Sequence, residues 1–283
     1  MFNLIRMNLY RMFHTGSTWI LMAVICGFSL FSAYMAVQDQ ELMREELENR
    51  TAAEEVQEEE SGQMFGIYLQ VPFYENGREP AFLEYICSDL QSGILLIFLS
   101  VFTVIFINGE SKSGFAKNIA GQISNRFTLY LSKIAAVMVF VFMAMLGDIL
   151  MQFTGFLIWH HGAPFGMDIL GKVLRYIVIQ FMLLSAFASG LALITTLIKS
   201  TAVSTTFALL VSCGFGQIFM GFFYKLFGDI SIKPEKYFIT NNVKSIVYDS
   251  STELLGRAAV IAVVFLVIYN VLGSIWVQRR DVV

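Results

Sequence analysis

Long uninterrupted apolar runs dominate the pattern of hydrophobic and polar positions along the chain. A helix needs about 20 predominantly apolar residues to cross the hydrocarbon core of a bilayer, and a soluble protein rarely buries even one such run. Six runs of suitable length are present, at residues 17–37, 92–108, 129–158, 173–198, 202–224 and 258–277. The pattern therefore predicts an all-α polytopic membrane protein with six transmembrane helices.

The first residues, 1–16, have a helical periodicity in place of a continuous apolar run. Apolar side chains fall on one side of a helical wheel and polar ones largely on the other: Phe2, Ile5, Leu9, Met12 and Phe13 against Asn3, Asn8, Arg11 and His14. This spacing predicts an amphipathic helix on the inner membrane surface, in contact with membrane lipid. The alternative is that these residues extend the first span, 17–37, into the cytoplasm.

Between the first two spans lies an acidic segment, residues 38–90, with fourteen carboxylates and three arginines and hence a net charge of −11. Its first part, 38–60, lacks Gly and Pro and is rich in Glu, Leu, Met and Ala, which predicts a helix. Residues 65–73 alternate between apolar and polar, which predicts a short strand weakened by Pro72 and followed by a turn. We expect a small ordered extracellular lobe here.

Composition supports the membrane assignment. Of the 283 residues, 56% are hydrophobic and 14% are charged, whereas soluble domains carry about 25% charged residues. The three cysteines, Cys26, Cys87 and Cys213, have neither disulfide-like nor metal-ligand spacing, so we predict no metal site. No nucleic-acid partner is expected either.

The distribution of basic residues predicts the orientation. Lys and Arg are denser in the short loops on one side of a six-span arrangement, at Arg6, Arg11, Lys112, Lys117, Arg126, Lys133, Lys199, Arg279 and Arg280. Because short cytoplasmic loops carry the excess of Lys and Arg, both termini are expected in the cytoplasm of a multi-pass cell-membrane protein. The acidic lobe and a second long loop, 225–257, then face outward, and residues 91–283 hold the other five spans.

The loop at residues 111–125 has the features of a short docking helix. Phe115, Ile119 and Ile123 stand four apart and share one helical face, and Lys112 and Lys117 lie off that face. An apolar ridge beside basic residues is suited to a groove on another protein. The alternative is an interfacial helix that rests on lipid.

This region resembles the cytoplasmic signature of type-2 ABC exporter permeases. The matching residues are Glu110, Gly114, Lys117, Asn118, Arg126, Ser132 and Lys133. Phe115 replaces a threonine common in that family, and the proline often found before the arginine is absent. The resemblance implies a six-helix half that dimerises with a second permease subunit, and a coupling helix at 111–125 that receives force from a separate ABC ATPase subunit.

No phosphate-binding loop of the form G-x-x-x-x-G-K-[ST] occurs in the chain. We therefore expect no enzyme activity and no bound cofactor in this chain, with ATP and Mg on the partner subunit. Energy then comes from that partner or from an ion gradient.

Polar residues inside the predicted spans are candidates for function because burying them in lipid is costly. Asp148 is the only acidic residue well inside a span, with Gln152 one turn away, and Gln217 lies among small residues of the fifth span. Each is either a pathway residue or an interhelical packing contact. The aromatic stripe Phe98, Phe102 and Phe106 either packs in the bundle or, if spans two and five flank the pathway as in the family, lines it.

The leading hypothesis is therefore the permease subunit of an ABC exporter for an amphipathic peptide or lipid-like molecule. The first alternative is an ion-coupled secondary transporter that uses Asp148 as its titrating group. A membrane enzyme such as an intramembrane protease is disfavoured, because no span carries paired catalytic groups.

Overall fold

The computed structural model describes residues 2–49, 80–112, 126–159, 164–198, 200–227 and 234–279 of the chain. Its elements are α1 (Phe2–His14), α2 (Gly16–Asn49), α3 (Phe82–Gln91), α4 (Ile94–Lys112), α6 (Arg126–Trp159), the 3-10 turn η1 (Met167–Ile169), α7 (Leu170–Leu197), α8 (Thr201–Ser212), α9 (Phe215–Phe227), the 3-10 turn η2 (Pro234–Tyr237), α10 (Ile239–Ser245) and α11 (Thr252–Arg279). No strand occurs in these ranges. The predicted all-α class is confirmed for the part of the chain that is described.

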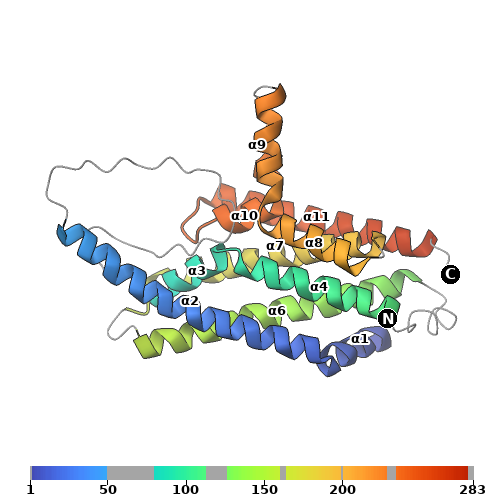
Figure 1. Cartoon of the computed structure of the whole chain (residues 1–283), viewed down its shortest axis with the longest axis horizontal. Helices are drawn as coiled ribbons and strands as arrows, with labels where there is room; N and C mark the ends of the chain where they lie inside the picture. Colours follow the sequence, from blue (N-terminus) through green and yellow to red (C-terminus); the bar gives the residue numbers. More distant parts are fainter. Residues whose placement is uncertain are drawn as a thin grey trace.

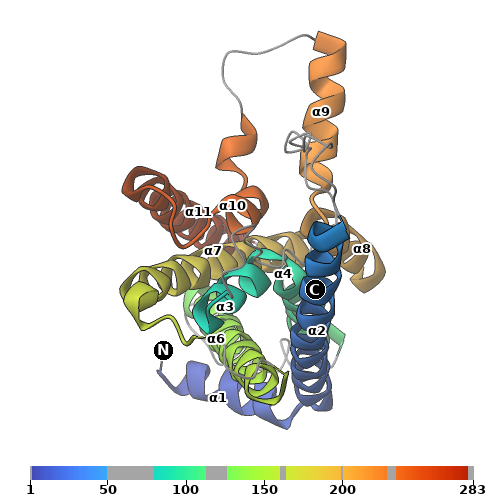
Figure 2. The same ribbon diagram turned by 90° about the vertical axis from the view of Figure 1, so that its left-hand side faces the viewer.

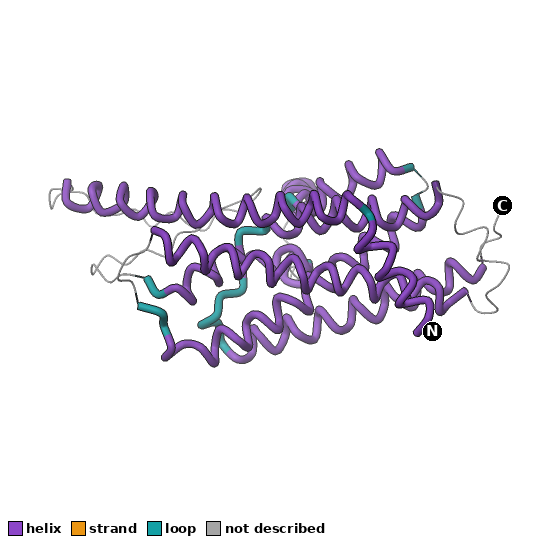
Figure 3. The backbone as a smooth tube through the Cα atoms, turned by 90° about the horizontal axis from the view of Figure 1, so that it is seen from below, coloured by secondary structure: helices purple, strands orange, loops and turns teal. Residues whose placement is uncertain are grey.

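The long helices lie lengthwise beside one another in a bundle (Figures 1 and 3). The closest neighbours are α7 with α11, α2 with α6, and α4 with both α7 and α8. The outer faces of the bundle carry exposed apolar side chains, among them Leu150, Leu157, Val178 and Val260. Exposed apolar surface of this extent is expected where lipid, and not water, surrounds the helices.

Four helical segments are long and apolar enough to cross a membrane: Gly16–Met43, Phe127–Trp159, Met167–Leu197 and Thr252–Arg279. Two further pairs, α3 with α4 and α8 with α9, meet the same criteria only if each bent pair forms a single span. The described residues therefore contain four to six candidate spans.

Both bends occur at a glycine with positive φ. Gly93, with a φ of 81°, separates α3 from α4 at a bend of 51°, and Gly214, with a φ of 92°, separates α8 from α9 at a bend of 70°. Glycine adopts this left-handed conformation at no steric cost because it lacks a Cβ. The predicted span at residues 202–224 is thus broken at Gly214 into two helices, and α9 projects away from the bundle (Figures 1 and 2).

The two described parts of the acidic segment do not form a separate unit. Residues 38–49 continue α2, and α3 lies among α2, α6 and α7 with its apolar side chains buried (Figure 2). The remainder, residues 50–79, lies outside the described residues and includes the predicted strand at 65–73. In the second long loop, 225–257, the structure describes the end of α9, η2, α10 and the start of α11.

Two glycine–tyrosine contacts hold α11 close to its neighbours. A Cβ added to Gly190 of α7 would lie 2.8 Å from Cε2 of Tyr269 in α11, and one added to Gly273 of α11 would overlap the ring of Tyr130 in α6. Small residues allow helix backbones to approach closely, which is the main source of packing energy between helices in lipid.

The Gly273 contact predicts that alanine substitutions at two glycines of α11 differ in their effect on stability. We expect Gly273→Ala to destabilise the bundle by about 1–3 kcal/mol, because the added methyl forces the buried Tyr130 ring to move. Gly256→Ala is the matched control, since nothing lies within 4 Å of its added Cβ. Thermal unfolding in detergent measures both. Equal melting temperatures for the two variants would contradict a close α6–α11 contact.

Candidate functional site

A buried polar cluster links α2, α3 and α6 in the bundle interior. Asp148 lies in α6 and Asp89 in α3, and the two residues are 3% and 8% exposed. The two carboxyl groups lie side by side, close enough to interact electrostatically. Asp148 was predicted to be the only acidic residue well inside a span. Asp89 lies before the predicted second span, and the structure places it on α3, inside the bundle.

Two serines of α2 orient these carboxyl groups. Ser32 Oγ donates to Asp89 Oδ1 at 2.6 Å, and the Ser29 hydroxyl donates to Asp148 Oδ1. Ser29 Oγ also lies 2.9 Å from the carbonyl oxygen of Ile25, and Gln152 Nε2 donates to the Ser29 carbonyl oxygen at 3.2 Å. Gln152 was predicted one turn from Asp148, and it contributes to the same cluster.

The two acidic side chains of the cluster have no basic side chain beside them among the described residues. Neither Asp89 nor Asp148 forms a salt bridge with a basic side chain of the described residues. The buried Oδ2 atom of Asp148 has no hydrogen-bond donor there other than the neighbouring Asp89 carboxyl group. A carboxylate inside a membrane costs about 3 kcal/mol on insertion scales, so this pair is an unusual feature of the bundle.

The aromatic stripe of α4 packs against other rings inside the bundle. Phe102 stacks on Phe140 of α6 with ring centroids 3.4 Å apart, and on Phe106 with centroids 5.5 Å apart. Phe98 contacts Phe28 of α2 at 5.9 Å. Phe102 and Phe106 are buried, so in this structure these two side chains act as core residues and not as the wall of an open pathway.

Gln217 takes part in a separate polar contact near the base of α9. Its Nε2 donates to Oδ1 of Asn241 in α10 at 2.6 Å, and Asn241 donates in turn to the carbonyl oxygen of Glu235. The structure therefore does not bring Gln217 and Asp148 together, although both were predicted as candidate pathway residues.

The predicted coupling helix falls mainly outside the described residues. Gly114, Phe115, Lys117 and Ile119 belong to this part, and so do the side chains of Glu110 and Arg126. The structure describes the helix ends that border it, because α4 ends at Lys112 and α6 begins at Arg126.

Helix α1 is attached to the bundle beside these two helix ends. Arg11 Nη2 donates to the Phe106 carbonyl oxygen of α4 at 3.3 Å, and its guanidinium carbon lies 4.2 Å from the centroid of the Phe106 ring. Asn8 Nδ2 donates to Ser132 Oγ of α6 at 2.9 Å, and the neighbouring Met12 is fully buried. One short helix therefore contacts both helices that flank residues 113–125.

These contacts involve the polar side of the amphipathic pattern at residues 1–16. The helical wheel places Asn8 on the polar face of α1 and Phe2 on the apolar face, yet Asn8 is 1% exposed and bonds to Ser132, while Phe2 is 80% exposed. A helical wheel shows only which residues share a face of the helix. It cannot show which polar side chains form hydrogen bonds with other helices.

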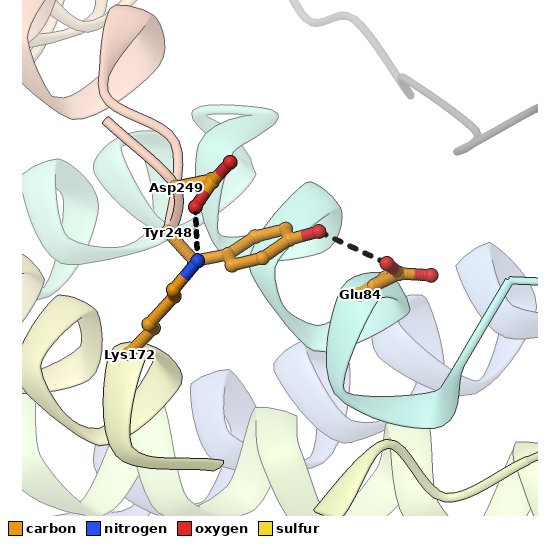
Figure 4. Close-up of polar contacts among 4 residues, drawn as sticks. All are labelled: Glu84, Lys172, Tyr248 and Asp249. Carbon is orange, nitrogen blue, oxygen red and sulfur yellow. Dashed lines mark hydrogen bonds and ion pairs between the residues drawn. The ribbon is translucent and has the colours of Figure 1, made fainter. Parts of the chain in front are cut away.

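The opposite end of the bundle is held by a second group of contacts (Figure 4). Tyr248, before α11, donates to Glu84 Oε1 of α3 at 2.9 Å, and Glu84 Oε2 accepts the Ala81 N–H at 2.8 Å. Lys172 of α7 pairs with Asp249 at 2.5 Å, but both side chains are more than half exposed, so this ion pair adds little stability.

A buried network continues from this end toward the carboxyl pair. Tyr176 of α7 donates to the Cys87 carbonyl oxygen of α3 at 3.1 Å, and Gln180 Nε2 lies within hydrogen-bond distance of both Tyr176 Oη and the Val243 carbonyl oxygen. In α10, burial lowers the pKa of the Lys244 ammonium. These residues were not predicted as candidates, because a single Tyr or Gln in an apolar run does not form a recognisable motif.

Within the described residues, no group of three or more His, Cys, Asp or Glu side chains is placed to hold a metal ion. The site is thus a carboxyl pair with hydroxyl and amide neighbours. Such a group can bind a cation or a proton, or join helices.

Comparison with known proteins adds no family assignment, since no protein-family model matches the chain and no curated protein is detectably similar to it.

The α1 contacts predict different roles for two arginines of the same helix. We expect Arg11→Gln to destabilise the attachment of α1 by about 2 kcal/mol, because it removes a hydrogen bond from a charged donor and a cation–π contact with Phe106. Arg6 is exposed, so Arg6→Gln makes the same charge change with an effect within about 0.5 kcal/mol. Thermal unfolding and the protease sensitivity of α1 measure the difference. Equal sensitivity of the two variants would show that α1 is not held through Arg11.

Proposed function

We propose that the chain is the permease subunit of an ABC exporter. In this proposal two permease subunits form the translocation pathway as a dimer, and a separate ABC ATPase subunit binds the coupling segment at residues 111–125. ATP and Mg are bound by that partner, and this chain carries no cofactor. The proposal includes six spans, with both bent pairs crossing the cell membrane, an outward-facing acidic lobe and both termini in the cytoplasm.

The arrangement at one end of the bundle carries this proposal. Helix α1, the end of α4, the start of α6 and the end of α11 lie together at one end (Figure 1). The described basic residues at this end include Arg6, Arg11, Lys133 and Arg279, as the positive-inside rule requires of a cytoplasmic face. A partner bound between Lys112 and Arg126 would thus contact the protein where α1 braces both flanking helices.

The length of α6 supports a mechanical role. It runs without a break for 34 residues, which corresponds to about 50 Å at 1.5 Å per residue. A displacement of its first turn by the ATPase would therefore be transmitted as a rigid-body motion past the Asp89–Asp148 pair to the opposite end of the bundle. α4 starts at the Gly93 bend, so it can tilt relative to α3 during the same motion.

The substrate class follows from the resemblance to exporters of amphipathic molecules. An amphipathic peptide or a lipid-like molecule suits a bundle whose outer faces are apolar and whose interior holds isolated polar groups. Membrane lipid is a further contact of the apolar outer helices.

Replacing Phe115 and Ile119 with Asp tests the coupling segment. We expect the double variant to lose co-purification with its ATPase at least tenfold, because apolar anchors carry most of the energy of docking interfaces. The permease itself should still insert into the membrane and unfold at its normal temperature.

Met167→Asp is the matched control, since Met167 is an exposed apolar residue in η1 at the opposite end of the bundle. It should leave the association intact. Undiminished binding of the ATPase by the Phe115/Ile119 variant would count against the proposal.

One observation favours a second function, an ion-coupled secondary transporter. Asp148 is buried in a long helix beside another carboxyl group, which is the usual setting of a proton or ion relay in a membrane. The two functions differ in the source of energy, and hence in whether transport needs an ion gradient.

Export by the Asp148→Asn variant separates the two functions. If an ATPase drives transport, we expect ATP-loaded vesicles without an ion gradient to export, and Asp148→Asn to retain at least about a third of the rate, within the small range expected for a non-coupling residue. Ion coupling predicts instead that a collapsed gradient or Asp148→Asn abolishes transport. Asp249→Asn, at an exposed carboxylate, is the control in both assays.

A further inference from the structure

The Asp89–Asp148 pair lacks a counter-charge in the protein. Both carboxyl groups are more than nine-tenths buried, and neither forms a salt bridge within the described part of the chain. Two adjacent carboxylates repel each other, and burial away from water raises the cost of this repulsion. A single positive charge bound at the pair would therefore reduce this repulsion.

We propose that Asp89, Asp148, Ser29 and Ser32 form a binding site for one monovalent cation, either a proton or a sodium ion. Either cation reduces the charge of the pair from −2 to −1. This inference does not depend on the proposed partner ATPase, because it concerns a site built wholly from the helices of this chain.

The surrounding groups suit such a ligand. All four side chains present oxygen atoms, which are the donors that hard cations prefer. The two serine hydroxyls fix one oxygen of each carboxyl group. Among the described residues, the buried Asp148 Oδ2 has no donor other than the neighbouring Asp89 carboxyl group. A proton would be shared between the two carboxyl groups, as in coupled carboxyl dyads.

The titratable groups around the pair lie on α2, α3, α7 and α10. Cys26 approaches Asp148 from α2, and Tyr176 approaches Asp89 from α7. On α3 itself Cys87 is buried, and Glu84 is engaged with Tyr248. The basic group of α10, Lys244, packs against Gly93 at the α3–α4 bend. None of these supplies the missing charge to the pair.

Occupation of the site should stabilise the bundle, because it removes repulsion between α3 and α6 while Ser29 and Ser32 hold both to α2. A ligand that binds only the folded state raises the melting temperature with the logarithm of its concentration. The proposal therefore makes the stability of this chain a function of pH or of sodium concentration.

The experiment measures thermal unfolding of the purified full chain in lipid nanodiscs. One series lowers the pH with potassium as the only alkali cation, and the other replaces KCl with NaCl at constant alkaline pH and ionic strength. We expect a rise in apparent melting temperature of about 3 °C or more in at least one series. Asp89→Asn, Asp148→Asn and the double variant should lose this response, because an amide of the same shape carries no charge.

The control variant Asp249→Asn should keep the response, since Asp249 is exposed and paired with Lys172. Stabilisation by acid alone identifies the ligand as a proton, and an infrared band of a protonated carboxyl that is absent from the double variant gives a second readout. Stabilisation by NaCl that protons compete away identifies sodium. No response in either series, or an unchanged response in the double variant, would overturn the proposal. The ATPase is absent from these measurements, so their failure leaves the proposed function unaffected.

Discussion

The structure depends on one constraint, which is that backbone N–H and C=O groups cannot remain unpaired in hydrocarbon. A chain with six apolar runs meets this constraint by forming helices, whose hydrogen bonds are internal to each segment. The described helices accordingly expose apolar side chains on their outer faces and bury a set of polar side chains inside the bundle. The two helix breaks occur at Gly93 and Gly214, where a glycine takes up the conformation that the bend requires.

Because lipid is as apolar as the side chains that face it, hydrophobicity alone cannot arrange such helices relative to one another. Close packing and a small number of polar contacts determine their arrangement. Gly273 against Tyr130 brings α11 onto α6, and Ser29 and Ser32 bind α2 to the carboxyl groups of α6 and α3. At the end where both termini lie, Asn8 and Arg11 join α1 to α6 and α4. The same contacts that hold the bundle thus connect the proposed ATPase-facing end to its interior.

The candidate site was only partly predictable. Asp148 and Gln152 were identified because a carboxylate and an amide stand out in an apolar run. Asp89 was missed, since it is one of fourteen carboxylates in an acidic segment of net charge −11, and nothing in the local sequence distinguishes it from the exposed ones. Its burial results from the fold of α3 into the bundle, which no local pattern indicates. The stripe at Phe98, Phe102 and Phe106 was correctly recognised as one helical face, but its ring partners Phe28 and Phe140 lie on other helices.

The sequence by itself determined the all-α class and the existence of the long apolar helices, because these depend on the length and period of apolar runs. Tertiary structure alone decided that residues 202–224 break at Gly214, that the polar face of α1 meets α4 and α6, and that Asp89 pairs with Asp148. The physical reason is the same in each case. Periodicity records which side chains favour an apolar environment, whereas the partner of a polar group is set by contacts between helices far apart in the chain.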